Sequence, residues 1–198
     1  KAIDAALTSI SNNAQSVTIM VEEGEYFGDI TINRDSYVVD EGTEDASDIK
    51  YELPANFTLN IVSSGATKVS SNGSTTYLAD ADGSAKVKGN IIIDGINVFM
   101  AGLYLELEKK ISAKNANVTY IGTTDDDNVN IELTQTDGQN HSVTVETGEG
   151  DDTVAVSAAR GKDTSNGNIT LDVSTGEGSD TITVEPGKGV TSTTVNAD

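Results

Sequence analysis

TGEGDDTVA at Thr147–Ala155 recurs as TGEGSDTIT at Thr175–Thr183, and a weaker copy, GTTDDDNVN, occupies residues 122–130. Each copy has an aspartate at its sixth position, and these three aspartates are separated by 25 and then by 28 residues. Self-similarity with a period of about 20–50 residues is the signature of a repeat architecture. The C-terminal part of the chain is therefore predicted to be a stack of repeated units.

Apolar residues alternate with polar ones on both sides of each aspartate. They lie nine and seven residues before it and two and four residues after it: Val118, Tyr120, Val129 and Ile131 in the first copy, Val143, Val145, Val154 and Val156 in the second, and Leu171, Val173, Ile182 and Val184 in the third. A period of two is typical of strands with one buried face. Each copy is therefore predicted to form a strand, an acidic turn, a second strand and a return loop.

The repeat length favours one fold class. A unit of 25 to 28 residues is close to one coil of a parallel β-helix, in which successive coils lie about 4.7–4.9 Å apart. We therefore predict an all-β, right-handed parallel β-helix with two inward-facing ladders of side chains. The first ladder is Val118, Val143 and Leu171, and the second is Val129, Val154 and Ile182.

The repeated segments resemble the G-G-x-G-x-D-x-U-x nonapeptide of calcium-binding β-rolls, the RTX-like repeats, with Thr147 or Thr175 in place of the first glycine. In that family the ion lies between successive turns and takes backbone carbonyl and aspartate oxygens. The resemblance implies calcium as the cofactor. The ligand positions that it implies are Gly148, Gly150, Asp152, Gly176, Gly178 and Asp180, with Asp125 and Asp127 from the first copy.

An electrostatic argument points the same way. Aspartates stacked at the spacing of the coils repel one another by roughly 1 kcal/mol in water and by roughly 3–4 kcal/mol at an effective dielectric constant near 20. A bound cation, outward displacement or protonation would relieve this repulsion. The alternative is that the segments are acidic turns without a metal, because glycine supplies positive φ angles and aspartate bonds its own backbone. Each motif is single rather than tandem, and both explanations remain open.

The N-terminal half shows strand patterns without acidic turns. Residues 17–26 followed by 28–32 resemble the opening of pectate-lyase-like right-handed β-helices, in which a strand enters a Gly-x-Tyr corner and leaves as a second short strand. Before them, Ile3, Ala6, Leu7 and Ile10 repeat at helical spacing and predict a short helix that caps the exposed end of the stack.

Further elements follow from composition. Strands are expected at Phe57–Val62, Asn90–Ile93 and Leu103–Leu107, and loops at Asp40–Asp48 and Ser63–Ser84, which are rich in Ser, Thr, Gly and Asp. No linker divides the chain. We expect one continuous domain, with a capped N-terminal part over residues 1–114 and a repeat part over residues 115–198, excised from a longer protein.

Composition limits the partners. The 198 residues carry a formal charge of −20 with only 12 Lys and Arg, which argues against nucleic acid and favours cations. No run of about 18 apolar residues predicts a membrane helix. There is no cysteine for disulfides or thiolate chemistry.

The only histidine and one EF-hand-like segment are not expected to bind a metal or to act in catalysis. His141 is the only histidine and is expected on the surface just before a strand. Residues 80–84, DADGS, open like an EF-hand loop, but no glutamate closes the loop at its twelfth position, so a solvated loop is expected.

Two function classes remain. The first is a non-enzymatic extracellular module of a large bacterial surface protein, of the adhesin kind, at the cell surface. Its expected partners are calcium, host or matrix glycans and neighbouring copies of the parent protein. The second is a polysaccharide lyase, hydrolase or epimerase on a β-helix. A calcium-assisted lyase needs a strong base beside the metal, and the two arginines, Arg34 and Arg160, are both expected in loops.

Overall fold

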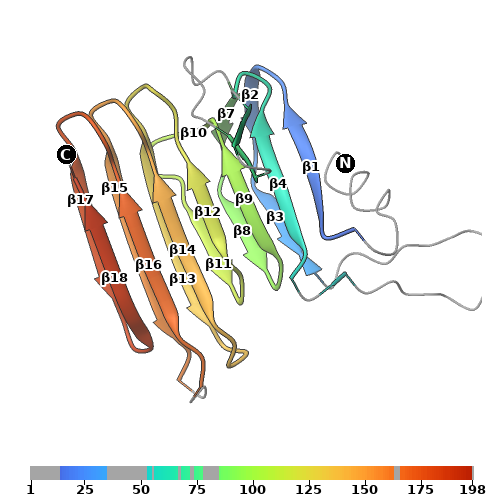
Figure 1. Cartoon of the computed structure of the whole chain (residues 1–198), viewed down its shortest axis with the longest axis vertical. Coiled ribbons are helices and arrows are strands. Elements are labelled where there is room, and N and C mark those ends of the chain that lie inside the picture. Colours follow the sequence, from blue (N-terminus) through green and yellow to red (C-terminus); the bar gives the residue numbers. More distant parts are fainter. Residues whose placement is uncertain are drawn as a thin grey trace, which may run out of the picture.

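The computed structural model describes residues 14–34, 53–54, 56–66, 68–71, 74–77, 85–162 and 166–197. Within these residues the regular structure consists of strands, with no α-helix, and Figure 1 shows them as a stack of coils. The prediction of an all-β fold with parallel strands is confirmed. The predicted cap helix, the loop at residues 40–48 and the EF-hand-like segment lie outside the described residues.

Two long parallel sheets form the opposite faces of the stack. Sheet A has the strand order β1 (Ser16–Val21), β4 (Thr58–Ser63), β9 (Asn97–Ala101), β12 (Val118–Ile121), β14 (His141–Glu146), β16 (Ile169–Ser174), β18 (Val190–Asn196). Sheet C has the order β3 (Ile30–Asn33), β8 (Ile91–Asp94), β11 (Ile111–Lys114), β13 (Asn128–Gln135), β15 (Thr153–Arg160), β17 (Thr181–Pro186). Each complete coil contributes one strand to sheet A and one strand to sheet C.

A third parallel sheet covers only the N-terminal coils. Sheet B has the order β10 (Leu103–Leu105), β7 (Ala85–Lys88), β2 (Gly24–Phe27). The first coils therefore have three sides, whereas each coil from β12 onward runs directly from sheet A to sheet C. Since sheet A continues from β1 to β18 across this change, the described residues form one stack.

The predicted ladders are present in register. Val118 pairs with Val143 and Val143 with Leu171 in sheet A, while Val129 pairs with Val154 and Val154 with Ile182 in sheet C. All but Ile182 are buried. They belong to a thin core of Val, Ile and Leu in which Tyr120 and Phe57 are the largest side chains. The period-two pattern therefore identified the buried face of each strand correctly.

The prediction of a loop over Ser63–Ser84 is wrong in part. Ser63 ends β4, and the segment contains a two-stranded antiparallel hairpin of β5 (Lys68–Ser71) and β6 (Ser74–Tyr77). Turn-forming composition concealed these strands, because Ser and Thr also occupy the exposed positions of hairpins. Strands β7, β9 and β11 were also not predicted, whereas β4, β8 and β10 lie within a few residues of their expected positions.

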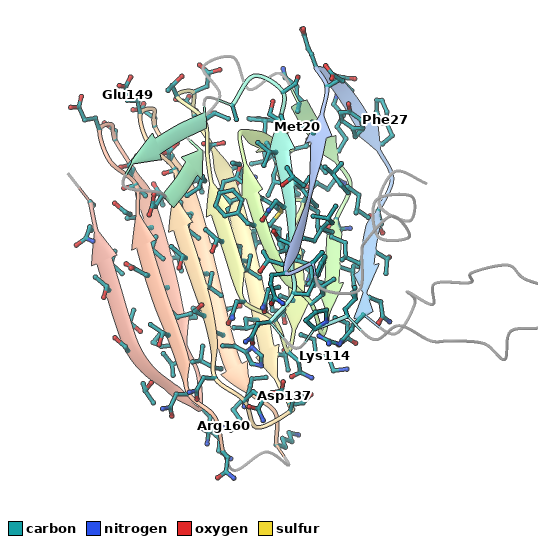
Figure 2. All side chains as sticks on the ribbon, turned by 45° about the vertical axis from the view of Figure 1, so that its right-hand side comes forward. Met20, Phe27, Lys114, Asp137, Glu149 and Arg160 are labelled. Carbon is teal, nitrogen blue, oxygen red and sulfur yellow. The ribbon has the colours of Figure 1, made fainter. Side chains whose placement is uncertain are left out.

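The N-terminal end of the stack exposes apolar side chains. Met20 of β1 is 50% exposed and Phe27 of β2 is 75% exposed, and Figure 2 shows both at that end. Beside them an apolar groove lies between the three sheets, lined among others by Ile19, Tyr26 and Leu103. This is the end that the predicted helix was expected to cover.

Candidate functional site

The acidic turns join sheet A to sheet C on one edge of the stack, where the N-terminal coils carry sheet B. They comprise residues 122–127, 147–152 and 175–180, and Glu149 marks this edge in Figure 2. A buried tyrosine, Tyr120, fills the interior beside the first turn. Its hydroxyl donates to the carbonyl oxygen of Leu103 in β10 and, at 3.3 Å, to Oδ1 of Asp127. Tyr120 thus connects the last strand of sheet B with the first acidic turn.

The predicted aspartates form a cross-coil ladder, here called the inner ladder: Asp127, Asp152 and Asp180. Oδ1 of Asp152 accepts a hydrogen bond from the backbone N–H of Asp127 at 2.8 Å, and Oδ1 of Asp180 accepts from the N–H of Asp152 at 3.0 Å. A carboxylate that accepts a backbone N–H makes a charge-assisted bond, which is stronger than a neutral one. Asp152 and Asp180 therefore each fasten their own turn to the turn before it, whereas the carboxylate of Asp127 bonds Thr123 within its own turn.

The preceding residues form a second ladder on the solvent side, here called the outer ladder: Asp126, Asp151 and Ser179. Oδ1 of Asp126 accepts from the N–H of Asp151 at 2.8 Å, and Oδ1 of Asp151 accepts from the N–H of Ser179 at 2.9 Å. The outer carboxylates therefore bind the following turn, whereas the inner ones bind the preceding turn. We did not predict this ladder, although the Asp-Asp pairs at 126–127 and 151–152 were its signal in the sequence.

The glycines of the turns are required by close stacking. A Cβ atom on Gly176 would lie 2.2 Å from the carbonyl oxygen of Gly148, and one on Gly178 would lie 1.8 Å from that of Gly150. All four have positive φ angles, between 74° and 146°. The backbone N–H groups of Gly148 and Gly150 also donate to Thr175 and Glu177 in the next turn. Glycine at these positions is therefore explained by packing and backbone conformation alone.

Burial changes the protonation of the inner ladder. Asp127 is 2% exposed, and desolvation, with a further contribution from the charge of Asp152, raises its pKa to about 7. The hydrogen bonds that Oδ2 of Asp127 accepts from the N–H of Thr123 at 2.6 Å and from the Thr123 hydroxyl at 3.3 Å oppose the rise. Burial also raises the pKa of Asp152, and Asp180 and Asp126 add to that rise. Protonation of Asp127 near neutral pH therefore relieves part of the repulsion along the ladder.

Two oxygens of the inner ladder lack a donor. Oδ2 of Asp152 and Oδ2 of Asp180 are buried without a hydrogen-bond partner, as is the hydroxyl of Thr175. The hydroxyl of Thr147 lies close enough to Asp152 to oppose its pKa rise, but it donates to the carbonyl oxygen of Thr175 at 3.3 Å. Carboxylate oxygens are ligands of Ca²⁺, and no protein donor competes for these two. This part of the corner fits a hard cation.

The fit is limited by the number of carboxylates. Among the residues that the structure describes, no three His, Cys, Asp or Glu side chains come together as metal ligands. Ca²⁺ takes about six to eight oxygens, so backbone carbonyls would have to supply most of them. The structure thus brings Asp152, Asp180 and the four glycines to one edge, as the sequence predicted. The exposed Asp125 carboxylate is not part of either ladder.

The only histidine differs from its predicted place. His141 begins β14 and is 9% exposed, and its Nε2 lies 3.0 Å from Oδ2 of Asp137. Its Nδ1 is buried without a partner. The expectation of a surface residue is therefore wrong, because Asp137, four residues earlier, covers the ring at the corner.

The arginines are tied to backbone carbonyls away from the acidic turns. Arg34 follows β3 and donates to the carbonyl oxygen of Gly95 at 3.3 Å and to that of Leu53. Arg160 is the last residue of β15 rather than a loop residue, and it donates to the carbonyl oxygen of Gly167. Figure 2 shows Arg160 on the edge opposite Glu149.

Comparison of the chain with protein-family models, with curated proteins and with solved structures found no match.

Because the turns stack closely, replacing a turn glycine by alanine should destabilise the fold. Gly178→Ala places a Cβ against the backbone of the neighbouring turn, whereas Gly24→Ala, at nearly the same φ (149° against 146°), meets no atom within 4 Å. We expect Gly178→Ala to lower the free energy of unfolding by at least about 2 kcal/mol more than Gly24→Ala does. Urea denaturation measures both values, and equal losses would show that the turns do not stack closely.

The raised pKa of Asp127 predicts a pH dependence of stability. A folded pKa near 7 against about 3.9 in the unfolded chain means that the folded state holds the extra proton between these values. Stability should therefore fall as pH rises from about 4 to about 7, by up to about 4 kcal/mol, and should level off above that. Asp127→Asn should remove this component and should be more stable than the wild type at pH 8.

The control for this prediction is Asp125→Asn, which removes an exposed carboxylate two residues away. It should retain the pH dependence of the wild type in urea denaturation at matched ionic strength. If both variants follow the wild-type profile, Asp127 does not carry the buried proton.

Proposed function

We propose that the chain is a non-enzymatic extracellular module of a large bacterial surface protein, structural and adhesive in role. The observation that supports this most is the unbroken sheet A, in which every strand from β1 to β18 pairs in parallel with its neighbour. Such a stack is a stiff element with long, polar outer faces, which suits display or spacing more than a reaction. Calcium, host or matrix glycans and neighbouring copies of the parent protein are the proposed partners.

The proposal includes two finer features of the fold. The coils wind in a right-handed sense, as parallel connections between strands of one sheet do in nearly all proteins. The helix predicted from Ile3, Ala6, Leu7 and Ile10 caps the end of the stack. The apolar groove at that end, lined among others by Ile19, Tyr26 and Leu103, supports a cap, because a cap would bury apolar surface that is otherwise open to water.

Calcium is proposed at the acidic turns, with Asp152 and Asp180 as the carboxylate ligands. Support comes from their two buried oxygens without donors and from the net charge of −20. Extracellular modules bind calcium with dissociation constants of about 10⁻⁴–10⁻³ M, and the ion is plentiful outside cells. Binding to the folded state alone would stabilise the stack by mass action.

The enzyme alternative has less support. A calcium-assisted lyase needs a base beside the metal, but both arginines are bonded to backbone carbonyls, and Arg160 lies on the opposite edge. A hydrolase needs two convergent carboxylates with room for substrate. The buried aspartates of the inner ladder are instead bonded to backbone amides. No described residue belongs to a helix long and apolar enough to cross a membrane, and the acidic surface does not favour nucleic acid.

The calcium proposal predicts a ligand-dependent melting temperature. Ca²⁺ at one hundred times its dissociation constant should add about 2.7 kcal/mol for one site, which raises the melting temperature by several degrees. Asp152→Asn and Asp180→Asn keep an oxygen for the cross-coil bond but remove the negative ligand, so each should reduce the rise. Differential scanning calorimetry with and without Ca²⁺ measures it.

The matched control is Asp172→Asn, which neutralises an exposed carboxylate on β16 and should leave the calcium effect unchanged. Sodium chloride at equal ionic strength should not reproduce the stabilisation, because screening relieves repulsion without supplying coordination. Coincident melts with and without Ca²⁺ would mean that the ladders need no metal.

The residues that the structure describes form no assembled catalytic set, and we therefore predict no turnover. Incubation with polygalacturonate, alginate and neutral polysaccharides, with and without Ca²⁺, should yield no unsaturated or shortened products by chromatography and absorbance. Turnover that disappears in Asp137→Asn or Asp152→Asn would overturn the non-enzymatic proposal in favour of a polysaccharide-active enzyme.

A further inference from the structure

A polar groove runs along the edge of the stack opposite the acidic turns. Its volume is about 660 Å³, and it is lined at the corners that follow β3, β8, β11 and β13. Lys114 and Asp137 mark this edge in Figure 2. Four successive coils spaced at about 4.8 Å span about 14 Å, so the groove has the length of a short extended polymer. Six of the lining residues are asparagines: Asn33, Asn56, Asn97, Asn115, Asn117 and Asn140.

Two of the asparagines form a ladder with a fixed orientation. Oδ1 of Asn97 accepts from the backbone N–H of Asn117 at 2.9 Å, and Oδ1 of Asn117 accepts from the N–H of Ser142 at 2.9 Å. Because the oxygen of each amide is committed to the next coil, the NH₂ group must point elsewhere. Within the described part of the chain, no protein acceptor receives a hydrogen bond from either NH₂ group. The ladder therefore presents one NH₂ group, with two N–H donors, in each of these coils.

The charges in the groove compensate one another. Among the described residues, the lining holds two cationic side chains, Lys114 and Arg34, and two carboxylates, Asp94 and Asp137. Lys114 Nζ lies 3.1 Å from Oδ2 of Asp94, and Arg34 is bonded to backbone carbonyls. A groove with paired charges in a chain of net charge −20 attracts neither a free cation nor an anionic polymer strongly. It suits a neutral ligand rich in hydroxyl groups.

The spacing of the donors favours a glycan over a peptide. Side chains on one face of an extended peptide recur about every 6.8 Å, which is out of step with coils at about 4.8 Å. One pyranose ring with its linkage extends a β-1,4-linked chain by about one coil spacing. Successive rings are turned over, but each ring carries hydroxyl groups on both edges, so each ring can accept from one coil. Among the described lining residues there is no Tyr, Phe or Trp, so recognition would depend on hydrogen bonds rather than on stacking.

We propose that this groove binds an extended, neutral β-1,4-linked glycan, with successive sugar rings bonded by the NH₂ groups of Asn97 and Asn117. The proposal rests on the adhesive function above and gives it a site. The groove binds without cleaving, because Nε2 of His141 faces Asp137 and Nδ1 is buried, which leaves no ring nitrogen for proton transfer to a ligand.

The test is titration of the ¹⁵N-labelled chain with cellohexaose, followed by nuclear magnetic resonance of the side-chain amides. The NH₂ signals of Asn97 and Asn117 should shift, and those of exposed asparagines such as Asn130 should not. Maltohexaose, which is helical, and hexagalacturonate, which is anionic, should bind more weakly. No shift with any oligosaccharide, or shifts confined to other faces, would overturn the groove as a binding site.

A double variant tests the donors directly. Asn97→Asp with Asn117→Asp keeps the oxygens that hold the next coil and removes both NH₂ groups, so the fold should be retained. We expect cellohexaose affinity to fall at least about tenfold, which corresponds to about 1.4 kcal/mol. The matched control, Asn130→Asp with Asn196→Asp, adds the same charge at exposed strand positions outside the groove and should bind like the wild type. Equal affinity of the two double variants would refute the assignment.

A separate readout distinguishes failure of the groove from failure of the adhesive function. Beads coated with the unmodified chain are tested for attachment to a polysaccharide matrix and to a surface coated with the same chain. Attachment without a shift at Asn97 and Asn117 would place adhesion on another face and refute only the groove. Cellohexaose shifts without any attachment would support the groove and refute the adhesive role.

Discussion

The fixed distance between parallel coils is the constraint on which the rest of this structure depends. Each backbone in sheets A and C bonds to the coils on either side, so equivalent residues must lie about 4.8 Å apart, directly above one another. That rule is favourable for Val143 and Leu171, whose apolar side chains bury one another. It is costly for Asp127 and Asp152, whose charges it holds close together. The hydrogen bonds and the raised pKa values at the acidic edge reduce this electrostatic repulsion.

The aspartates use the same spacing that makes them repel. Oδ1 of Asp152 accepts a hydrogen bond from the backbone N–H of Asp127. This bond stabilises the negative charge of Asp152 and gives the N–H group a partner. The outer carboxylates do the same in the opposite direction through Asp126 and Asp151. Burial raises the pKa of Asp127, and protonation removes part of the remaining repulsion. Calcium is the third means of compensation, proposed for the oxygens of Asp152 and Asp180 that have no donor.

The sequence predicted the ladders because a repeat fixes both the period of the strands and the register between coils. Val118, Val143 and Leu171 have the same offset from their aspartates, and identical offsets become neighbours in a stack. It did not predict the hairpin of β5 and β6, since Ser and Thr suit both loops and exposed strands. Asp126 bonds the following turn and Asp152 the preceding one. This difference depends on side-chain torsion angles, which cannot be read from a sequence pattern. The groove was missed because its asparagines come from four separate corners, and His141 because a residue four positions away covers it.

The opposite directions of the two aspartate ladders have a mechanical consequence. Strands β1 and β18 are the outermost strands of sheet A, so tension applied through them acts along the hydrogen bonds rather than across them. Under such tension the hydrogen bonds between neighbouring coils break one coil at a time. Where the acidic turns lie, each junction between layers carries one carboxylate bond anchored in the upper layer and one anchored in the lower. Separating any two layers of the acidic half therefore requires breaking both kinds of carboxylate bond.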